Sequence, residues 1–287
     1  MSIVITGATG HLGGLVIRHL LKKVPASKII ASVRNVEKAS HLAELGVEVR
    51  YGDYNDYESM KKSFAGASKA LFISSPDFDN TLRVRQHANV VQAARDAGVN
   101  HIAYTGYAFA EEAKLSLALP HLATEYAIRT TNIPYTFLRN ALYTDFFVHP
   151  GLKAAVEHGV LITNAGSGRL NTVTRNDLAL AAATVLVEEG HENKTYNLVA
   201  NQTWSFDDLA QILTALSGKK VIHQAVSFDE AKENFVKNGL PEPMAVEFAK
   251  IYHAIAEGET AKTSDDLQKL IGNATPFEET VKQVLQS

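Results

Sequence analysis

Cysteine is absent from this chain of 287 residues. Disulfide bonds, thiolate nucleophiles, iron–sulfur clusters and zinc sites built on cysteine are therefore excluded. The chain also lacks a cluster of charges of one sign. Its 28 lysines and arginines are nearly balanced by 31 aspartates and glutamates, and there is neither a basic tract nor an acidic tail. We therefore expect no nucleic-acid partner.

Long hydrophobic runs are missing as well. No apolar stretch reaches the roughly 20 residues of a membrane-spanning helix, and the chain opens directly on a strand-like segment without the charged and apolar regions of a signal peptide. We expect a cytoplasmic protein with no membrane partner. The length is enough for one large domain or for a domain with a smaller second domain. The sequence is also compatible with a homodimer.

The most informative stretch of the chain is rich in glycine. Gly7, Gly10 and Gly13 lie between the apolar run 3–5 and the apolar-periodic segment 15–21, which places them between a strand and a helix. Gly7 would allow a tight turn, Gly10 the approach of a pyrophosphate, and Gly13 close packing of helix on strand. The free N–H groups of the helix start would hold the phosphates. This context predicts a nucleotide cofactor, and a glycine turn kept for packing is the alternative.

Strand and helix patterns alternate through the first half of the chain. The apolar segments predict strands at 3–5, 28–33, 47–51, 70–73, 101–104 and 135–138. The segments between them predict helices at 12–24, 36–45, 56–66, 80–97 and 119–131. Such alternation is typical of βαβ units, so we predict an α/β fold with a doubly wound parallel sheet of the Rossmann type.

The alternation loosens after about residue 140. Further strands are predicted at 161–163 and 196–199, and further helices at 151–158, 177–189, 205–217, 228–238 and 243–257. We expect residues 1–140 to form the nucleotide-binding domain and residues 141–287 a smaller α/β lobe that binds the substrate. The boundary is approximate, because the chain is expected to cross between the two parts. The lobe should pack at the carboxyl ends of the strands, where ligands of such sheets bind.

The end of the second predicted strand indicates which dinucleotide is bound. An NAD-binding unit usually carries Asp or Glu there, about 20 residues after the glycines, to hold the ribose 2′-hydroxyl. Here Arg34 stands in that place, between Val33 and Asn35. A guanidinium can form a bidentate, charge-assisted contact with a 2′-phosphate. The sequence therefore favours NADPH over NADH, with a solvated surface arginine as the alternative.

A proton donor is missing where one is often found. Many hydride-transfer enzymes with this glycine pattern use Tyr-x-x-x-Lys on the helix after the fifth strand, but only Tyr57 and Lys61 have that spacing, on a different helix. At the expected helix, His121 and Glu125 share one face by their i, i+4 spacing. A catalytic role for His121 and a structural pair both stay open, and no third ligand suggests a metal site.

The absence of a placed acid bears on the acceptor. A ketone needs its developing alkoxide protonated or stabilised. A carbocation becomes neutral when it takes hydride, and a quinone gives a hydroquinone anion that solvent can protonate. The pattern therefore points to such acceptors.

Aromatic residues follow the fifth and sixth predicted strands. Tyr107 and Phe109 come after the fifth, and Tyr143, Phe146 and Phe147 come after the sixth. They are our candidates for the walls of a flat substrate pocket near the cofactor. Aromatics at this place can equally seal the joint between two lobes, and both interpretations stay open.

The chain resembles the NmrA-like branch of the short-chain dehydrogenase superfamily. The resemblance is carried by the runs 6–13, 32–35, 73–75, 87–98, 101–107 and 130–147, and it extends over nearly the whole chain. That branch contains members without the tyrosine–lysine pair, among them reductases that use NADPH to reduce cationic triarylmethane dyes or quinones. The resemblance implies a Rossmann domain with a smaller substrate lobe, and it implies cofactor contacts at Gly7, Ala8, Thr9, Gly10, His11, Leu12, Arg34, Ser74, Ser75, Pro76, Leu138, Arg139, Asn140, Ala141, Leu142 and Tyr143.

Our leading hypothesis is an NADPH-dependent oxidoreductase that delivers hydride directly to a flat, electron-poor aromatic acceptor, either a quinone or a triarylmethane cation. The alternative is a redox sensor of the NmrA type, which binds NADP and regulates partners without turnover. The aromatic cluster beside the expected nicotinamide position favours the enzyme.

Overall fold

A parallel sheet of seven strands forms the larger half of the molecule, in a computed structural model that describes residues 2–287. The strands are β1 (Ile3–Thr6), β2 (Ile29–Val33), β3 (Glu48–Tyr51), β4 (Lys69–Phe72), β5 (His101–Tyr107), β6 (Tyr135–Asn140) and β11 (Lys194–Leu198). Their order across the sheet is β11-β6-β5-β4-β1-β2-β3, and every neighbouring pair is parallel. The α/β fold and the doubly wound sheet predicted from the alternation are confirmed.

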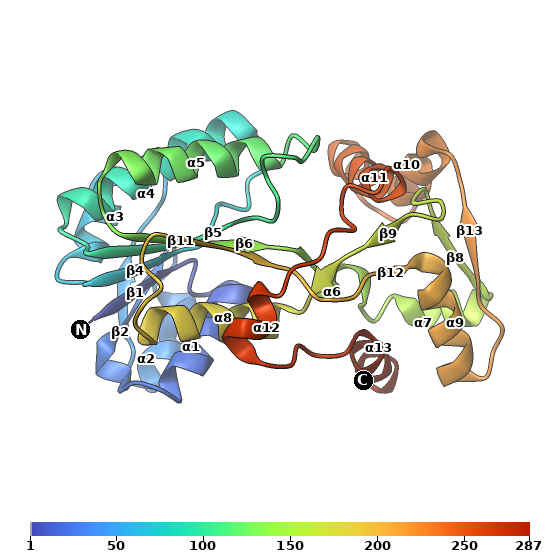
Figure 1. Cartoon of the computed structure of the whole chain (residues 1–287), viewed down its shortest axis with the longest axis horizontal. Coiled ribbons are helices and arrows are strands. Elements are labelled where there is room, and N and C mark those ends of the chain that lie inside the picture. The colour runs from blue at the N-terminus through green and yellow to red at the C-terminus, as the bar shows by residue number, and fades with distance from the viewer. Residues whose placement is uncertain (1) are drawn as a thin grey trace.

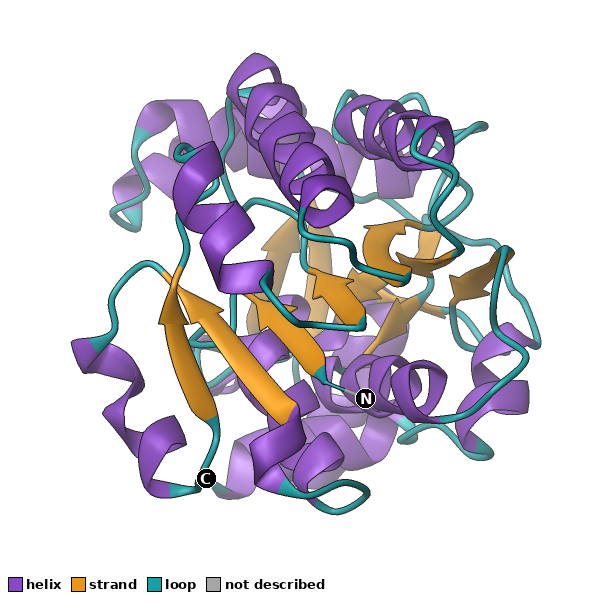
Figure 2. Ribbon diagram, turned by 90° about the vertical axis from the view of Figure 1, so that its left-hand side faces the viewer, coloured by secondary structure: helices purple, strands orange, loops and turns teal. Residues whose placement is uncertain are grey.

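Helices cover both faces of this sheet (Figures 1 and 2). One layer consists of α3 (Tyr57–Phe64), α4 (Asn80–Asp96) and α5 (Ala118–Thr130). The other consists of α1 (His11–Leu21), α2 (Ser40–Glu44), α8 (Arg175–Val187) and α12 (Asp266–Ile271), together with the short 3₁₀ turns η1 (Ala26–Lys28) and η2 (Glu37–Ala39).

The first strand shows why the sequence folds this way. All four residues of β1 are buried, and successive side chains of a strand point to opposite faces. Ile3 and Ile5 join the hydrophobic core under α1 and α8, whereas Val4 joins the core under α3, α4 and α5 with Phe72 and Tyr104. Burial of each such aliphatic side chain contributes roughly 1.5–3 kcal/mol. A strand buried on both faces has to be apolar throughout, as 3–5 is.

The smaller half is built on three short two-stranded sheets. Its strands are β7 (Leu142–Tyr143), β8 (Val160–Thr163), β9 (Arg169–Leu170), β10 (Thr172–Val173), β12 (Trp204–Ser205) and β13 (Ile222–Ala225). Its helices are α6 (Thr144–Phe147), α7 (Leu152–His158), α9 (Phe206–Ser217), α10 (Phe228–Lys237), α11 (Glu242–Ala256) and α13 (Phe277–Gln286). A separate core, centred on Phe147, Trp204 and Phe206, holds this lobe together.

The chain passes between the two halves more than once. After leaving β6 it enters the lobe, and it then returns to supply α8, which packs on α1, and β11, which pairs with β6. It returns again as α12, which packs on α8. The larger half therefore includes residues beyond position 140, and the boundary at that position stays a prediction. Within residues 2–287, no helix is both long enough and apolar enough to span a membrane.

Candidate functional site

The carboxyl ends of five parallel strands meet at one edge of the sheet. Gly7 follows β1, Arg34 follows β2, Ser74 lies just after β4, Tyr107 ends β5 and Asn140 ends β6. Because the sheet order is β6-β5-β4-β1-β2, these residues succeed one another along the edge. The strand order reverses between β4 and β1, and open α/β sheets bind ligands at this kind of switch point. The sequence-predicted residues are thus brought to one place.

The glycine turn is shaped to leave its backbone amides accessible. Gly7 adopts a φ of +60°, and the Gly10 N–H donates a hydrogen bond of 2.9 Å to the Gly7 carbonyl. A Cβ atom on Gly13 would lie 2.4 Å from the Gly7 oxygen, so only glycine allows this packing. Helix α1 starts at His11 and no side chain caps it. Its first N–H groups are therefore free to donate to phosphate oxygens.

The other predicted residues of this turn divide into two sets. Thr9 and His11 are exposed, whereas Ala8 and Leu12 are buried in the core below the turn. Arg34 is exposed at the end of β2, and no ion pair joins its guanidinium to any of residues 2–287. A free guanidinium at this place suits the 2′-phosphate of NADPH.

A hydrogen-bond network fixes the end of β4 beside the glycine turn. The hydroxyl of Tyr54 lies 2.5 Å from Thr6 Oγ1 and 2.6 Å from the carbonyl oxygen of Ile73. The amide of Ser74 donates to Thr105 Oγ1 at 2.9 Å. The ends of β1, β4 and β5 are thereby connected, which would keep the bed for an extended ligand rigid. Pro76, beyond this network, is exposed.

His87 supports the same loop in its neutral form. The Ser75 amide donates to His87 Nε2 at 2.8 Å, so this nitrogen has to be the unprotonated one. The opposite nitrogen, Nδ1, then donates to Thr124 Oγ1 at 2.7 Å. Burial, and after it the positive charge of Arg83, lowers the pKa of His87 to about 3.

His121 is likewise held on both ring nitrogens. Arg83 Nη2 lies 3.1 Å from Nε2 and can only donate, so Nδ1 carries the proton and donates to the hydroxyl of Tyr104 at 2.8 Å. Burial, with a further contribution from Arg83, lowers the pKa of His121 well below its usual value. Burial also raises the pKa of the Tyr104 phenol. Neither group is set up to release a proton near neutral pH.

A cavity of about 220 Å³ opens beside His121, between the sheet edge and the smaller lobe. The rings of Tyr107 and His121 are stacked, with centroids 6.4 Å apart and an angle of 25°. Tyr143 and Phe146 also line the cavity, and Ile251 of α11 contributes from the lobe. Mostly apolar walls with a few convergent polar groups are typical of a site for a flat aromatic ligand.

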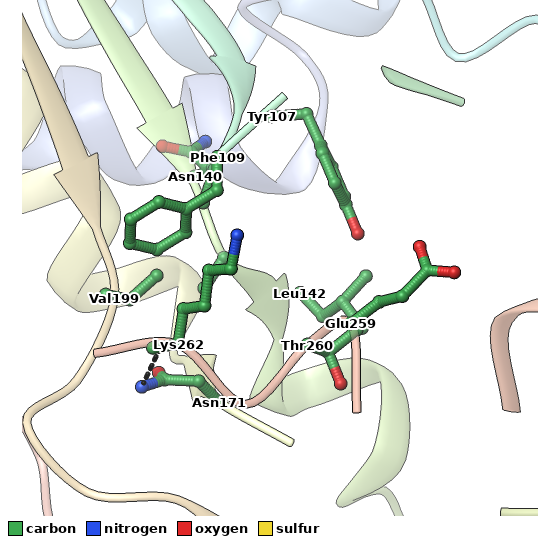
Figure 3. A pocket seen from close by; sticks show the side chains of 11 residues that line it. Tyr107, Phe109, Asn140, Leu142, Asn171, Val199, Glu259, Thr260 and Lys262 are labelled. Atoms are coloured by element: carbon green, nitrogen blue, oxygen red, sulfur yellow. Dashed lines mark hydrogen bonds between the residues drawn. The ribbon is translucent and has the colours of Figure 1, made fainter. Parts of the chain in front are cut away.

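A smaller hollow adjoins this cavity and shares Tyr107, Asn140 and Leu142 with it (Figure 3). Phe109 lies here with a φ of +52°, and its amide donates to Asn197 Oδ1 at 3.0 Å. The ammonium of Lys262 lies 5.2 Å from the centre of the Phe109 ring. The segment around Lys262 therefore closes the hollow from the side of the lobe.

The side chains of three predicted site residues are engaged in core packing or in ion pairs within the protein. Leu138 is fully buried in the core. Arg139 forms ion pairs with Glu111 and Glu125, which accept hydrogen bonds from four of its five N–H donors. Any cofactor contact of Leu138 or Arg139 would have to come from the backbone. Phe147 touches the cavity but is packed against aromatic rings of the lobe core.

The pair of His121 and Glu125, one of the two interpretations that the sequence leaves open, is not formed, since each residue bonds to a different arginine. Arg83, Ile251 and Lys262 were not foreseen as site residues. Arg83 had a signal in the sequence, because Arg83, Gln86 and His87 occupy the helical positions i, i+3 and i+4 that apolar residues normally fill. Within residues 2–287, no group of three or more metal-binding side chains comes together.

Comparison with known proteins adds to this geometry. The model of the NmrA-like family matches residues 1–280. Quinone oxidoreductase 2 of Escherichia coli K12 is 42% identical over 273 residues, covering 95% of this chain and 94% of the relative.

Two solved structures share the fold closely. The triphenylmethane reductase of Citrobacter sp. in complex with NADP(H) is 73% identical, with a TM-score of 0.98 over 99% of this chain and 100% of that chain. An NADPH-dependent quinone oxidoreductase of E. coli in complex with NADPH is 41% identical, with a TM-score of 0.94 over 99% of each chain.

Proposed function

The chain belongs to the NmrA-like family, and from this premise we propose that it is an NADPH-dependent reductase of flat, electron-poor aromatic acceptors. The acceptor would be a quinone or a triarylmethane dye cation, as the names of its relatives suggest. The observation that carries the proposal is a single sheet edge. It has an uncapped helix start and the free Arg34 at one end, and a cavity with aromatic walls at the other.

The residues of this edge fit NADPH by their chemistry. The N–H groups at the start of α1 would hold the pyrophosphate, beside Gly10, which has no side chain to obstruct it. Arg34 would hold the 2′-phosphate. The residues from Ser74 to Pro76 and from Asn140 to Tyr143 would then flank the nicotinamide. The bound cofactor supplies a hydride, which carries two electrons.

The protein's own contribution to the reaction is positioning. Tyr107, Tyr143 and Phe146 would hold a flat acceptor and exclude water from it. His121 is not prepared as a proton donor, because both of its nitrogens are engaged and its pKa is lowered. Burial also raises the pKa of Tyr107 to about 12 and raises that of Tyr143, so neither phenol readily gives up its proton. This arrangement suits acceptors whose reduction requires no proton in the transition state.

The test is an assay of NADPH oxidation against a panel of quinones and cationic triarylmethane dyes, with NADPH binding measured separately by fluorescence. Turnover with at least one acceptor, faster with NADPH than with NADH, is the expected result. Tight NADPH binding without oxidation by any acceptor would instead identify a redox sensor.

A further inference from the structure

Arg83 carries a buried positive charge, and no carboxylate of residues 2–287 forms an ion pair with it. It lies in the first turns of α4, and only 4% of its surface is exposed. Among residues 2–287, no aspartate or glutamate oxygen lies within ion-pair distance of it, whereas the other deeply buried arginine near the site, Arg139, has both Glu111 and Glu125. Buried charges in proteins are normally paired, so this one calls for an explanation.

Most of the hydrogen-bond donors of Arg83 are unused. A guanidinium has five N–H donors, and the described chain accepts one of them, at His121 Nε2. The Nε atom is buried without a partner. Arg83 lines the cavity of about 220 Å³, and it also lines a neighbouring cavity of about 150 Å³ on the side of Asp77 and Glu247. Arg83 therefore borders the space where the acceptor would be held, and most of its donors have no acceptor among residues 2–287.

The hydrogen-bonded neighbours of Arg83 are neutral, and Asp77, which attracts the guanidinium from a distance, forms no ion pair with it. His121 and His87 are neutral by their hydrogen bonds, and Tyr104 keeps its proton. Desolvation lowers the pKa of Arg83 itself, yet an arginine stays protonated in proteins. The acceptor cavity is thus positive on the side of α4, and its other walls are mainly aromatic or aliphatic.

We propose that Arg83 is the residue that binds the acceptor oxygen on which negative charge develops, and that it makes quinones, rather than cationic dyes, the acceptors for which this cavity is built. The inference rests on the proposed function and narrows its substrate class. A guanidinium beside a cationic dye repels it, whereas the same group beside a quinone carbonyl attracts the forming oxyanion.

The reaction balances without a further reactant. Hydride transfer converts the quinone and NADPH into the hydroquinone monoanion and NADP⁺, so the quinone gains two electrons and one proton. The negative charge rests on an oxygen, where the N–H groups of Arg83 can donate to it. Solvent then supplies one proton to give the hydroquinone.

The first experiment measures binding without turnover in the wild-type protein saturated with NADP⁺. The probes are 2-hydroxy-1,4-naphthoquinone, which is an anion at neutral pH, and its neutral analogue 2-methoxy-1,4-naphthoquinone. We expect the anion to bind at least about tenfold more tightly, as for a hydrogen bond to a charged group. Equal affinities would overturn the proposal, and this outcome does not depend on any variant folding.

The second experiment uses Arg83→Met, Arg83→Lys and, as matched control, Arg85→Met, which removes an exposed arginine from the same helix. In Arg83→Met we expect the affinity for the anionic probe and kcat/KM for 1,4-naphthoquinone to fall by at least about tenfold. The loss of kcat/KM should be smaller for the cationic dye malachite green than for the quinone. Arg83→Lys should lose less, and Arg85→Met should behave as wild type.

Equal losses for quinone, anionic probe and dye in Arg83→Met would show that Arg83 only maintains the structure of the site, and would overturn the proposal. Failure of the proposed function is a separate result: the wild-type protein would then bind no NADPH, or oxidise it with no acceptor at all.

Discussion

The Nδ1 atom of His121 lies 2.8 Å from the hydroxyl oxygen of Tyr104, and Arg83 occupies the opposite nitrogen of the same ring. His121 is therefore a neutral link between two buried groups. A proton on its second nitrogen would have to face the guanidinium of Arg83. These hydrogen bonds explain why His121 need not act as a general acid, although it lies on the helix where a proton donor is expected.

The first prediction follows for the variant His121→Gln, in which a side-chain oxygen can still accept from Arg83. Dye reduction should stay within about tenfold of wild type, because general acid catalysis contributes ~10²–10⁴-fold where it operates. Stopped-flow decay of NADPH absorbance between about pH 5.5 and 7 should show no ionisation near the ordinary histidine pKa of about 6.5. A thousandfold loss in a folded variant, with a wild-type rate that follows one such group, would make His121 the acid.

The second prediction concerns the choice of dinucleotide. Arg34→Ala should weaken NADPH binding by about 1.5–3 kcal/mol, the range for a hydrogen bond to a charged group, and should leave NADH binding nearly unchanged. Titration by NADPH fluorescence measures both affinities. Lys38→Ala, which removes another exposed cation five residues after the end of β2, serves as control. If both cofactors lost equal affinity, Arg34 would not be the residue that recognises the 2′-phosphate.

The third prediction compares two neighbouring glycines of α1. Gly13→Ala would place a Cβ atom 2.4 Å from the Gly7 carbonyl oxygen, whereas in Gly14→Ala the nearest backbone oxygen would be 3.7 Å away. Gly13→Ala should therefore displace the turn and lower both stability and NADPH affinity. Gly14→Ala should be neutral or stabilise the protein by about 0.5–1 kcal/mol, because alanine is the better helix former. Thermal unfolding and NADPH titration of both variants test this, and identical behaviour would contradict it.

The fourth prediction separates two adjacent phenylalanines. Phe146 is partly exposed in the cavity, whereas Phe147 is buried in the core of the lobe. Phe146→Ala should raise the KM for the acceptor more than it changes NADPH affinity. Phe147→Ala should lower the free energy of unfolding by about 3–5 kcal/mol, as expected for loss of a buried aromatic ring. Steady-state kinetics and urea denaturation measure the two effects, and the interpretation of Phe146 as a wall of the site fails if its variant merely unfolds.

The fifth prediction is a loss of stability in acid. Burial lowers the pKa of His101 to about 4 and that of His87 to about 3, whereas both should titrate near 6.5 in the unfolded chain. The unfolded state therefore takes up protons first as the pH falls. The stabilisation is complete above about pH 6.5 and decreases below it, by roughly 1.4 kcal/mol per pH unit for each histidine.

Urea denaturation at pH 7.5, 6 and 5 measures this slope. In His101→Gln the free energy of unfolding should fall less steeply with decreasing pH than in wild type, by the roughly 1.4 kcal/mol per pH unit that one histidine contributes. An unchanged slope would mean that His101 is protonated in the folded protein or already neutral in the unfolded one.

The parts of the fold that sequence patterns predict are those with local signals. The sheet and most helices followed from runs of apolar residues at strand or helix spacing, as in β1. Strand β5 is longer than predicted, because Gly106 does not resemble a strand residue and yet is buried within it. Helices α12 and α13 and strand β13 were not predicted, since few of their residues are buried.

The candidate site, like the fold, was predictable only where its residues lie close together in the sequence. The glycine turn and Arg34 depend on short sequence distances, and the structure brings them to one edge. The partner of Arg83, His121, lies 38 positions away along the chain. The partners of Arg139, Glu111 and Glu125, lie 28 and 14 positions away. No rule on sequence spacing reveals that Arg139 contacts two carboxylates while Arg83 contacts a neutral histidine ring. The unpaired charge of Arg83 is therefore visible only in the structure.

The position of β11 at the edge of the sheet also bears on how the protein is made. A ribosome has to synthesise almost 200 residues before this strand can pair with β6, and more than 260 before α12 can cover α8. Until then the nascent sheet has an unpaired edge at β6 and an uncovered apolar helix. Such surfaces recruit chaperones or aggregate. From the synthesis of β6 until that of α12, the protein therefore depends on whatever shields those two surfaces.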